Sequence, residues 1–221
     1  AVCVESNVFD QHDLLLNVLN GTLDLSTGNL RPHRRDDMLT QLANVVYDPE
    51  ATCPQWRDFV ESICDGDGDL IDFLCRAAGY ALTGSTTEQA FFILHGNGCN
   101  GKSTYLEILK GLMGDYGQTA ETSTFLEKHG DTIPNDLAAL RSARLVLASE
   151  TGHRRSLNEP LIKRVTGSEA IASRFLHCEF FTYVPRFKVM LATNDKPRVF
   201  GTDRGIWRRI RLIPFTVNFE G

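Results

Sequence analysis

The sequence lacks any apolar run long enough to cross a bilayer. Its longest apolar stretches, near residues 90–94 and 188–192, are far shorter than the roughly 20 residues that a membrane helix needs. No secretory signal is recognisable at its amino end. Hydrophobic residues make up 42% and charged residues 23%, close to globular averages, which excludes disordered, collagen-like and coiled-coil chains. Ala1 stands where an initiator Met would, so we expect 221 residues cut from a longer polypeptide.

The six cysteines include no Cys-x-x-Cys pair, and no histidine follows them at a zinc-ligand spacing. The sequence therefore predicts no zinc site, and scattered single thiols are typical of a reduced, cytoplasmic protein. The acidic run 65–69 imitates the start of a calcium loop. Leu70 and Arg76 stand where an EF-hand requires Gly and Glu, so we interpret the run as a solvated turn between helices.

Charge is distributed unevenly. Residues 1–140 carry 8 Lys or Arg and 21 Asp or Glu (8 − 21 = −13), whereas residues 141–221 carry 15 and 7 (15 − 7 = +8). A basic last third on an acidic body indicates either a localised surface for a polyanion or a charge-paired interface between the two parts. Charge alone leaves both interpretations open.

The periodicity of apolar residues divides the chain in two. Residues 1–85 are predicted to form a small, mixed, mostly helical region, with a β unit over 17–35 and helices over 56–63 and 70–79. Residues 86–221 are predicted to alternate strands with helices, which indicates an α/β fold with a parallel sheet and flanking helices. Strands are expected over 90–94, 145–148, 189–192 and 210–214, and helices over 103–113 and 157–165, the latter capped by Ser156.

A complete phosphate-binding loop follows the first of these strands and opens the next helix. The eight residues from Gly96 to Ser103 fit G-x-x-x-x-G-K-[ST]. Backbone N–H groups would cradle phosphates there, Lys102 would reach the β- and γ-phosphates, and Ser103 would ligate Mg²⁺. The predicted ATP-binding residues are Gly96, Asn97, Gly98, Cys99, Asn100, Gly101, Lys102, Ser103 and Thr104.

An apolar strand that ends in acid supplies the second half of such a site. Residues 144–150 read Arg-Leu-Val-Leu-Ala-Ser-Glu, and Glu150 would hold the Mg²⁺ shell or orient the attacking water. Many such strands end in two acids, and Ser149 occupies the first of those positions. Whether Glu150 polarises water, contacts the metal, or does both stays open.

The segments downstream resemble the superfamily-three helicases, AAA+-like ATPases found in primase–helicases of phages, plasmids and large DNA viruses. The resemblance is carried by residues 157–174, by 187–197 with its Ala-Thr-Asn ending, and by 205–215 with its Trp-Arg-Arg; Ser168-Glu169 departs from the usual Gly and Asp. Residues 17–30 and 56–84 resemble the helical region that precedes this core. The resemblance implies a P-loop core with a β-hairpin insertion and an ATP-dependent helicase that acts as a ring, most simply a hexamer.

The same resemblance implies further site residues. Asn194 matches the polar sensor, and Arg209 matches the arginine finger that reaches a neighbour's ATP, with Arg204 and Arg208 as close alternatives. The resemblance also implies that the insertion touches single-stranded DNA, and its cations and rings suit phosphates and bases. Its predicted DNA-binding residues are Lys163, Arg174, Phe181, Tyr183, Arg186 and Lys188.

We therefore expect a DNA helicase or translocase core that uses ATP and Mg²⁺, with single-stranded DNA and further copies of itself as partners. A primase domain is expected elsewhere in the full polypeptide, and a phage or plasmid origin would place the protein in the bacterial cytoplasm. Two other functions stay open: a P-loop NTPase that packages DNA or remodels protein without unwinding, and a non-catalytic nucleic-acid-binding remnant. The hairpin argues against the first and the intact ATPase residues against the second.

Overall fold

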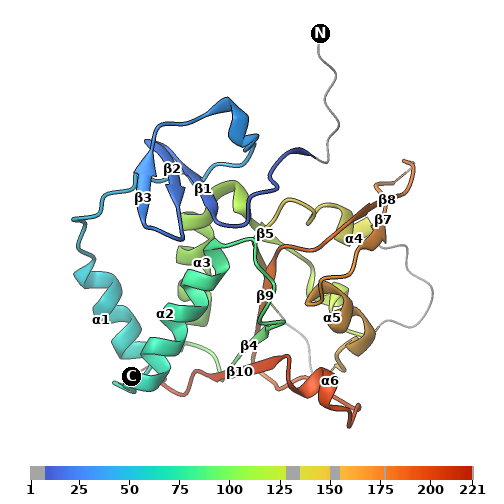
Figure 1. The fold of residues 1–221 in the computed structure, drawn as a ribbon. Helices are drawn as coiled ribbons and strands as arrows, with labels where there is room; N and C mark the ends of the chain where they lie inside the picture. Colours follow the sequence, from blue (N-terminus) through green and yellow to red (C-terminus); the bar gives the residue numbers. More distant parts are fainter. Residues whose placement is uncertain (1–7, 128–134, 150–154, 177, 221) are drawn as a thin grey trace.

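The computed structural model describes residues 8–127, 135–149, 155–176 and 178–220. A five-stranded parallel sheet lies at the centre, with strand order β10-β4-β9-β6-β5 (Figure 1). The strands are β1 (Leu15–Val18), β2 (Gly21–Asp24), β3 (Asn29–Arg31), β4 (Phe91–His95), β5 (Gly117–Thr119), β6 (Leu145–Ser149), β7 (Ile171–Ser173), β8 (Phe181–Tyr183), β9 (Lys188–Thr193) and β10 (Ile210–Pro214). The helices are α1 (Pro54–Ile63), α2 (Gly68–Leu82), α3 (Lys102–Met113), α4 (Asn135–Ala138), α5 (Glu159–Val165) and α6 (Arg204–Trp207).

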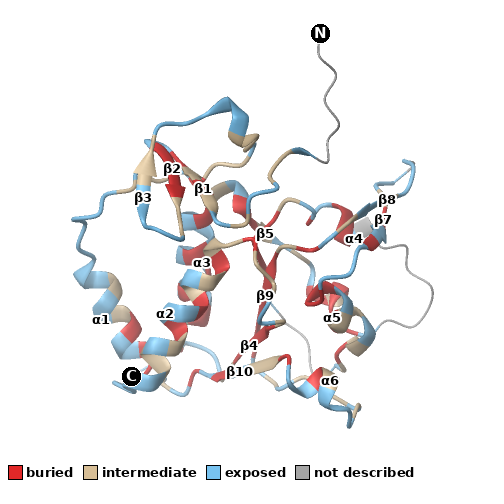
Figure 2. Cartoon of the chain, in the orientation of Figure 1, coloured by how far each residue is buried: buried red, intermediate tan, exposed pale blue. Residues whose placement is uncertain are grey.

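The central strands bury both of their faces, so their apolar residues run without interruption. Alternate side chains enter two separate cores, as the two-residue period of a strand requires. Phe92, Leu94 and Met190 pack with α1, α2 and α3 on one face, whereas Phe91, Ile93 and Leu191 pack with α5 and α6 on the other. Figure 2 shows this burial concentrated along β4 and β9. The predicted α/β fold with a parallel sheet and flanking helices is confirmed.

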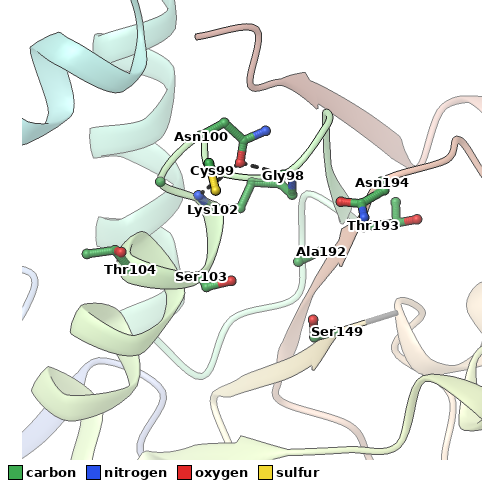
Figure 3. A pocket seen from close by; sticks show the side chains of 11 residues that line it. Gly98, Cys99, Asn100, Lys102, Ser103, Thr104, Ser149, Ala192, Thr193 and Asn194 are labelled. Atoms are coloured by element: carbon green, nitrogen blue, oxygen red, sulfur yellow. Dashed lines mark hydrogen bonds between the residues drawn. The ribbon is translucent and has the colours of Figure 1, made fainter. Parts of the chain in front are cut away.

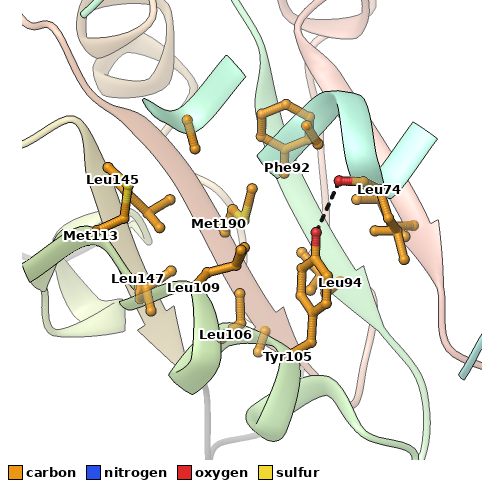
Figure 4. Close-up of a cluster of buried hydrophobic side chains, with 14 of the residues drawn as sticks. Leu74, Phe92, Leu94, Tyr105, Leu106, Leu109, Met113, Leu145, Leu147 and Met190 are labelled. Atoms are coloured by element: carbon orange, nitrogen blue, oxygen red, sulfur yellow. Dashed lines mark hydrogen bonds between the residues drawn. The ribbon is translucent and has the colours of Figure 1, made fainter. Parts of the chain in front are cut away.

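The amino-terminal region shares one of these cores with the sheet. Leu16, Val60 and Leu74 belong to the same cluster as Phe92 and the residues of α3. Figure 4 shows this packing, in which the hydroxyl of Tyr105 on α3 donates to the carbonyl of Leu74 on α2 at 3.1 Å. The division at residue 85 stays a prediction, and the core runs across it.

A buried arginine also ties the amino-terminal region to the sheet. Arg144, directly before β6, donates to the carbonyls of Leu82 (2.7 Å), His12 (3.0 Å) and Leu15 (2.6 Å). Its guanidinium lies 4.5 Å from the centre of the Tyr116 ring. The amino edge of the sheet is therefore bound to three carbonyls from the first 85 residues.

Several expected element boundaries differ in the structure, and three of the differences have a visible structural cause. Helix α2 continues through Gly79 to Leu82, because the following turn still buries Ala81 in the core. Helix α5 is capped by Asn158, whose side chain accepts from Leu161 N, and Ser156 lies two residues too early to cap it. The acidic run 65–69 is a turn only in its first part: Asp67 caps α2 by accepting from Leu70 N at 3.1 Å, and residues 68 and 69 already belong to that helix.

The segment between α5 and β9 forms the expected β-hairpin. Strands β7 and β8 pair antiparallel, with Ile171 opposite Tyr183 and Ser173 opposite Phe181. The hairpin projects from the body of the molecule beside α4 (Figure 1). In the part of the chain that the structure describes, no helix combines the length and the apolar character that a membrane span needs.

Candidate functional site

The phosphate loop lies at the carboxyl edge of the sheet, where three adjacent parallel strands end together. Strand β4 ends at His95 and leads into the loop, β6 ends at Ser149, and β9 ends at Thr193, directly before Asn194. Loops that follow the carboxyl ends of parallel strands form the usual ligand crevice of such sheets. A cavity of about 320 Å³ lies here, lined by residues 98–104, Ser149 and residues 192–194.

The loop depends on glycine at two positions. Gly96 has a φ of +155°, and a Cβ there would lie 2.1 Å from the carbonyl oxygen of Phe215. Gly101 has a φ of +85° and immediately precedes α3, and a Cβ there would lie 2.5 Å from Ile63. Any larger residue would push the loop off its neighbours, so the motif's glycines are required by packing as well as by conformation.

Lys102 is buried and points back into the loop. Its Nζ donates to the carbonyl of Gly96 at 2.6 Å and to Oδ1 of Asn100 at 3.0 Å. Burial lowers the pKa of this lysine, and among the described residues it forms no ion pair. An anion that enters the cavity can therefore replace these two neutral acceptors as the partner of Lys102, without breaking an ion pair among the described residues.

Positive potential also extends to His95, the last residue of β4. Burial lowers the pKa of His95, and the charges of Lys196 and Lys102 lower it further. The N-terminus of α3 adds its own dipole at the loop. The cavity is therefore electrostatically suited to a polyphosphate.

Asn100 braces the loop, a role that the motif alone does not predict. This buried side chain donates to the carbonyls of Asn97 and of Phe215, the latter at 3.1 Å. The segment after β10 adds two further contacts: Phe219 N donates to the carbonyl of Cys99 at 2.8 Å, and the Cys99 thiol donates to Glu220 at 2.7 Å. The loop is thus held from the β10 side as well as by α3.

Asn194 and Ser149 lie across the cavity from Lys102 and Ser103 (Figure 3). The carbonyl of Ser149 accepts from the hydroxyl of Thr122 at 2.6 Å, which fixes the end of β6. The structure therefore brings the predicted sensor residue to the predicted phosphate loop. Glu150, the predicted metal and water ligand, lies outside the described residues.

The candidate arginine finger has a different environment from the one expected. Arg209 is 9% exposed, and its guanidinium donates to the hydroxyl of Thr166 at 3.0 Å and to the carbonyl of Gly205 at 2.5 Å. Arg204 and Arg208 are both exposed on or beside α6. Of the three predicted candidates, Arg204 and Arg208 are therefore open to solvent, and Arg209 is held by its own chain.

Three of the cations expected along DNA are committed elsewhere. Lys188 is 1% exposed and donates to the carbonyls of Thr83 and Ser85, because it lies at the buried start of β9. Arg186 donates to the Asp10 carbonyl at 2.6 Å and to Gln11 at 2.8 Å, and Lys163 pairs with Asp203 at 2.7 Å. The structure therefore removes Lys188 from the expected DNA surface and leaves Arg186 and Lys163 as partners of their own chain.

The remaining predicted residues lie on the hairpin. Arg174 covers the Phe180 ring at 4.7 Å, and Phe181 and Tyr183 share one face of β8, with ring centres 6.1 Å apart. Sequence reasoning missed Arg141, which lies 5.6 Å from the centre of the Phe181 ring. No motif surrounds Arg141, so only the fold reveals its neighbour.

The comparisons with known proteins point to one group. The family model described as "D5 N terminal like" matches residues 1–65. A protein named "Putative helicase" from Acanthamoeba polyphaga mimivirus is 28% identical over 95% of this chain, and another from Invertebrate iridescent virus 3 is 25% identical over 97%. A "Putative primase" from African swine fever virus is 22% identical over 95%.

This chain spans only 22%, 24% and 23% of those three relatives. Among solved structures, the C-terminal region of NrS-1 aligns with a TM-score of 0.59 at 13% identity, over 76% of this chain and 40% of that one. The structural match supports the fold alone. Together the comparisons confirm the resemblance to primase–helicase-type proteins of large DNA viruses.

Proposed function

We propose that this chain is the ATP-hydrolysing core of a DNA helicase or translocase that acts on single-stranded DNA as a ring. The observation that carries the proposal is the cavity at the carboxyl edge of the sheet, which joins Lys102 and Ser103 to Ser149 and Asn194. The relatives' names, helicase and primase, favour DNA as the polymer on which such an ATPase acts.

Each residue would have a distinct task in hydrolysis. Lys102 would exchange its two neutral acceptors for β- and γ-phosphate oxygens, and the loop's N–H groups would hold the remaining phosphate charge. Asn194 would hold the attacking water, and Glu150 would accept its proton as the γ-phosphoryl group leaves ADP.

The oxygen-rich side of the cavity fits Mg²⁺. The Ser103 hydroxyl lines the cavity opposite the end of β6, so Ser103 and Glu150 would supply the protein oxygens that this hard cation prefers. When bound, Mg²⁺ would neutralise charge on the β- and γ-phosphates. The ring would add an arginine from the neighbouring copy, with Arg204 or Arg208 better placed than Arg209.

ATP hydrolysis by the purified chain, measured with and without single-stranded DNA, tests the proposal. We expect DNA to stimulate turnover, Lys102→Ala to abolish nucleotide binding and turnover, and Glu150→Gln to bind ATP but not hydrolyse it. Lys110→Ala, on the exposed face of α3, is the matched control and should leave turnover unchanged.

Two outcomes would contradict the proposal. Hydrolysis that ignores DNA, with no strand separation on a forked duplex, would support the packaging or remodelling NTPase. Nucleotide binding without any hydrolysis in the unmodified chain would support the non-catalytic remnant.

A further inference from the structure

A second, larger cavity lies near the opposite edge of the sheet from the phosphate loop. It has a volume of about 600 Å³. Its lining includes residues 9–11 and Asp13 of the amino-terminal region, residues 141–144 before β6, and residues 181–184 and Arg186 of the hairpin and the turn after it. Cavities of this size hold ligands as large as a nucleotide. Of the predicted site residues that the structure describes, Phe181, Tyr183 and Arg186 line it.

The acidic groups of this cavity are already engaged. Both carboxylate oxygens of Asp10 accept from Thr40, through its N–H and its hydroxyl. Asp13 forms an ion pair with Arg186 at 3.5 Å, although its buried Oδ1 accepts no hydrogen bond among the described residues. Arg144 is held by three carbonyls.

Among the charged residues that line this cavity, Arg141 differs from the others. Its side chain is exposed, and among the described residues its guanidinium has the Phe181 ring as its neighbour and forms no ion pair. The charge that this cavity offers to a ligand is therefore positive.

Aromatic rings run from the tip of the hairpin to this cavity. Phe175 stacks on Phe181 with ring centres 5.7 Å apart, and Phe181 is followed on the same face by Tyr183 at 6.1 Å. Near the tip, Phe180 is 60% exposed beneath Arg174. The Tyr183 hydroxyl donates to the Leu137 carbonyl at 2.6 Å and so anchors the inner end of the series to α4. Phe175 and Phe180 are exposed and Phe181 is half-buried, so part of each of these rings is open to a base.

We propose that Arg141 and Phe181 form a nucleotide subsite at the base of the hairpin, in which one base of a single strand stacks against the ring while Arg141 pairs with its phosphate. This inference rests on the proposed function and adds a residue from outside the hairpin to its DNA contacts. A strand fits better than a free nucleotide, because several rings on one hairpin, with Arg141 on Phe181 and Arg174 on Phe180, match a repeating base and phosphate. One available arginine is also too little charge for a triphosphate.

Fluorescence anisotropy with a labelled single-stranded oligodeoxynucleotide tests the subsite. Arg141→Gln should weaken binding about tenfold and reduce the slope of log affinity against log salt by about 0.7, the value for one phosphate contact on a single strand. Phe181→Leu should weaken binding of the normal strand about tenfold and leave binding of an abasic strand of the same length unchanged. Arg57→Gln, an exposed arginine on α1, is the matched control and should bind like the unmodified chain.

Three results separate this inference from the proposed function. If Arg174→Gln weakens binding while Arg141→Gln and Phe181→Leu match the Arg57→Gln control, the subsite is wrong and the proposed function stands. If the unmodified chain does not bind the strand, both fail. Competition by excess mononucleotide would overturn the choice of a strand as ligand.

Because Phe181→Leu could loosen the hairpin, Phe175→Leu, at an exposed ring, should reproduce its loss of base-dependent binding.

Discussion

Two buried lysines show how environment assigns different tasks to the same residue type. Lys102 and Lys188 both donate to carbonyl oxygens of their own chain. Lys102 lines an open cavity, so a phosphate can replace its present acceptors. Lys188 lies under the Tyr80 ring, 4.9 Å from its centre, at the closed start of β9. The first lysine is therefore placed to bind a ligand and the second to join the amino-terminal region to the sheet.

The stability of the chain should depend on pH through Lys188. Burial, and to a lesser degree the charge of Arg144, lowers the pKa of Lys188 to about 7, whereas an unfolded lysine titrates near 10.4. Between these values the unfolded state holds one more proton, so the free energy of unfolding rises with pH, by at most about 1.4 kcal/mol per pH unit. Below pH 7 both states are protonated and this contribution is constant.

Denaturant titrations from pH 6 to pH 10 on the unmodified chain and on Lys188→Met measure this effect. The difference in unfolding free energy between the two proteins should change between pH 7 and pH 10 and stay constant below pH 7. Lys110→Met, which removes a lysine from the exposed face of α3, is the control. Parallel curves for Lys188→Met over the whole range would show that Lys188 stays charged in the fold.

At the level of elements, helix α2 shows a boundary that the sequence pattern predicts incorrectly. A glycine after an apolar stripe is a common helix end, so the sequence predicts that α2 ends at Gly79. The structure continues α2 for another three residues, because Ala81 reaches the core. Tertiary packing thus overrides a local signal.

Gly79 consequently offers a stabilising substitution. It lies on the exposed side of α2 with an ordinary helical φ, and a Cβ there would meet nothing within 4 Å. Gly79→Ala should raise the free energy of unfolding by about 0.5–1 kcal/mol, because alanine loses less backbone entropy on folding. The contrasting variant is Gly101→Ala, where a φ of +85° and a contact at 2.5 Å should lower stability by more than 1 kcal/mol. Thermal unfolding of both variants checks the pair, and a lower melting temperature for Gly79→Ala would mean that the end of α2 is strained.

For the whole molecule, the sequence predicts the parts of the fold that obey periodicity or a contiguous motif. The parallel sheet and the glycine loop are of this kind, since their residues are neighbours in the chain. Contacts between distant segments are not predictable in this way. The brace from Asn100 to Phe215, the clamp of Arg144 on Leu15, and the pairing of Arg141 with Phe181 join residues whose separations carry no pattern. The burial of Lys188 and Arg209 is unpredictable for the same reason, since both lie in a basic part of the sequence and are buried by distant segments.

The ring itself is tested through the arginines beside α6. Arg208 is exposed at the end of this helix, whereas Arg209 is held by Thr166 and Gly205. If Arg208 completes the ATP site of the next copy, Arg208→Ala should bind ATP normally and lose about 10³-fold or more in turnover. Mixing it with Lys102→Ala should restore hydrolysis, because some interfaces then join an intact Lys102 to an intact Arg208.

Arg57→Ala, far from α6 on α1, is the control that should hydrolyse ATP normally on its own. Arg209→Ala should instead lower the melting temperature, since it leaves Thr166 and the Gly205 carbonyl without their partner. If mixed assemblies form, as measured by light scattering, and hydrolysis is not restored, the arginine acts within its own subunit. Hydrolysis restored by mixing with Arg204→Ala, but not with Arg208→Ala, would identify Arg204 as the finger. Only the residue that crosses the interface can be supplied by a neighbouring copy.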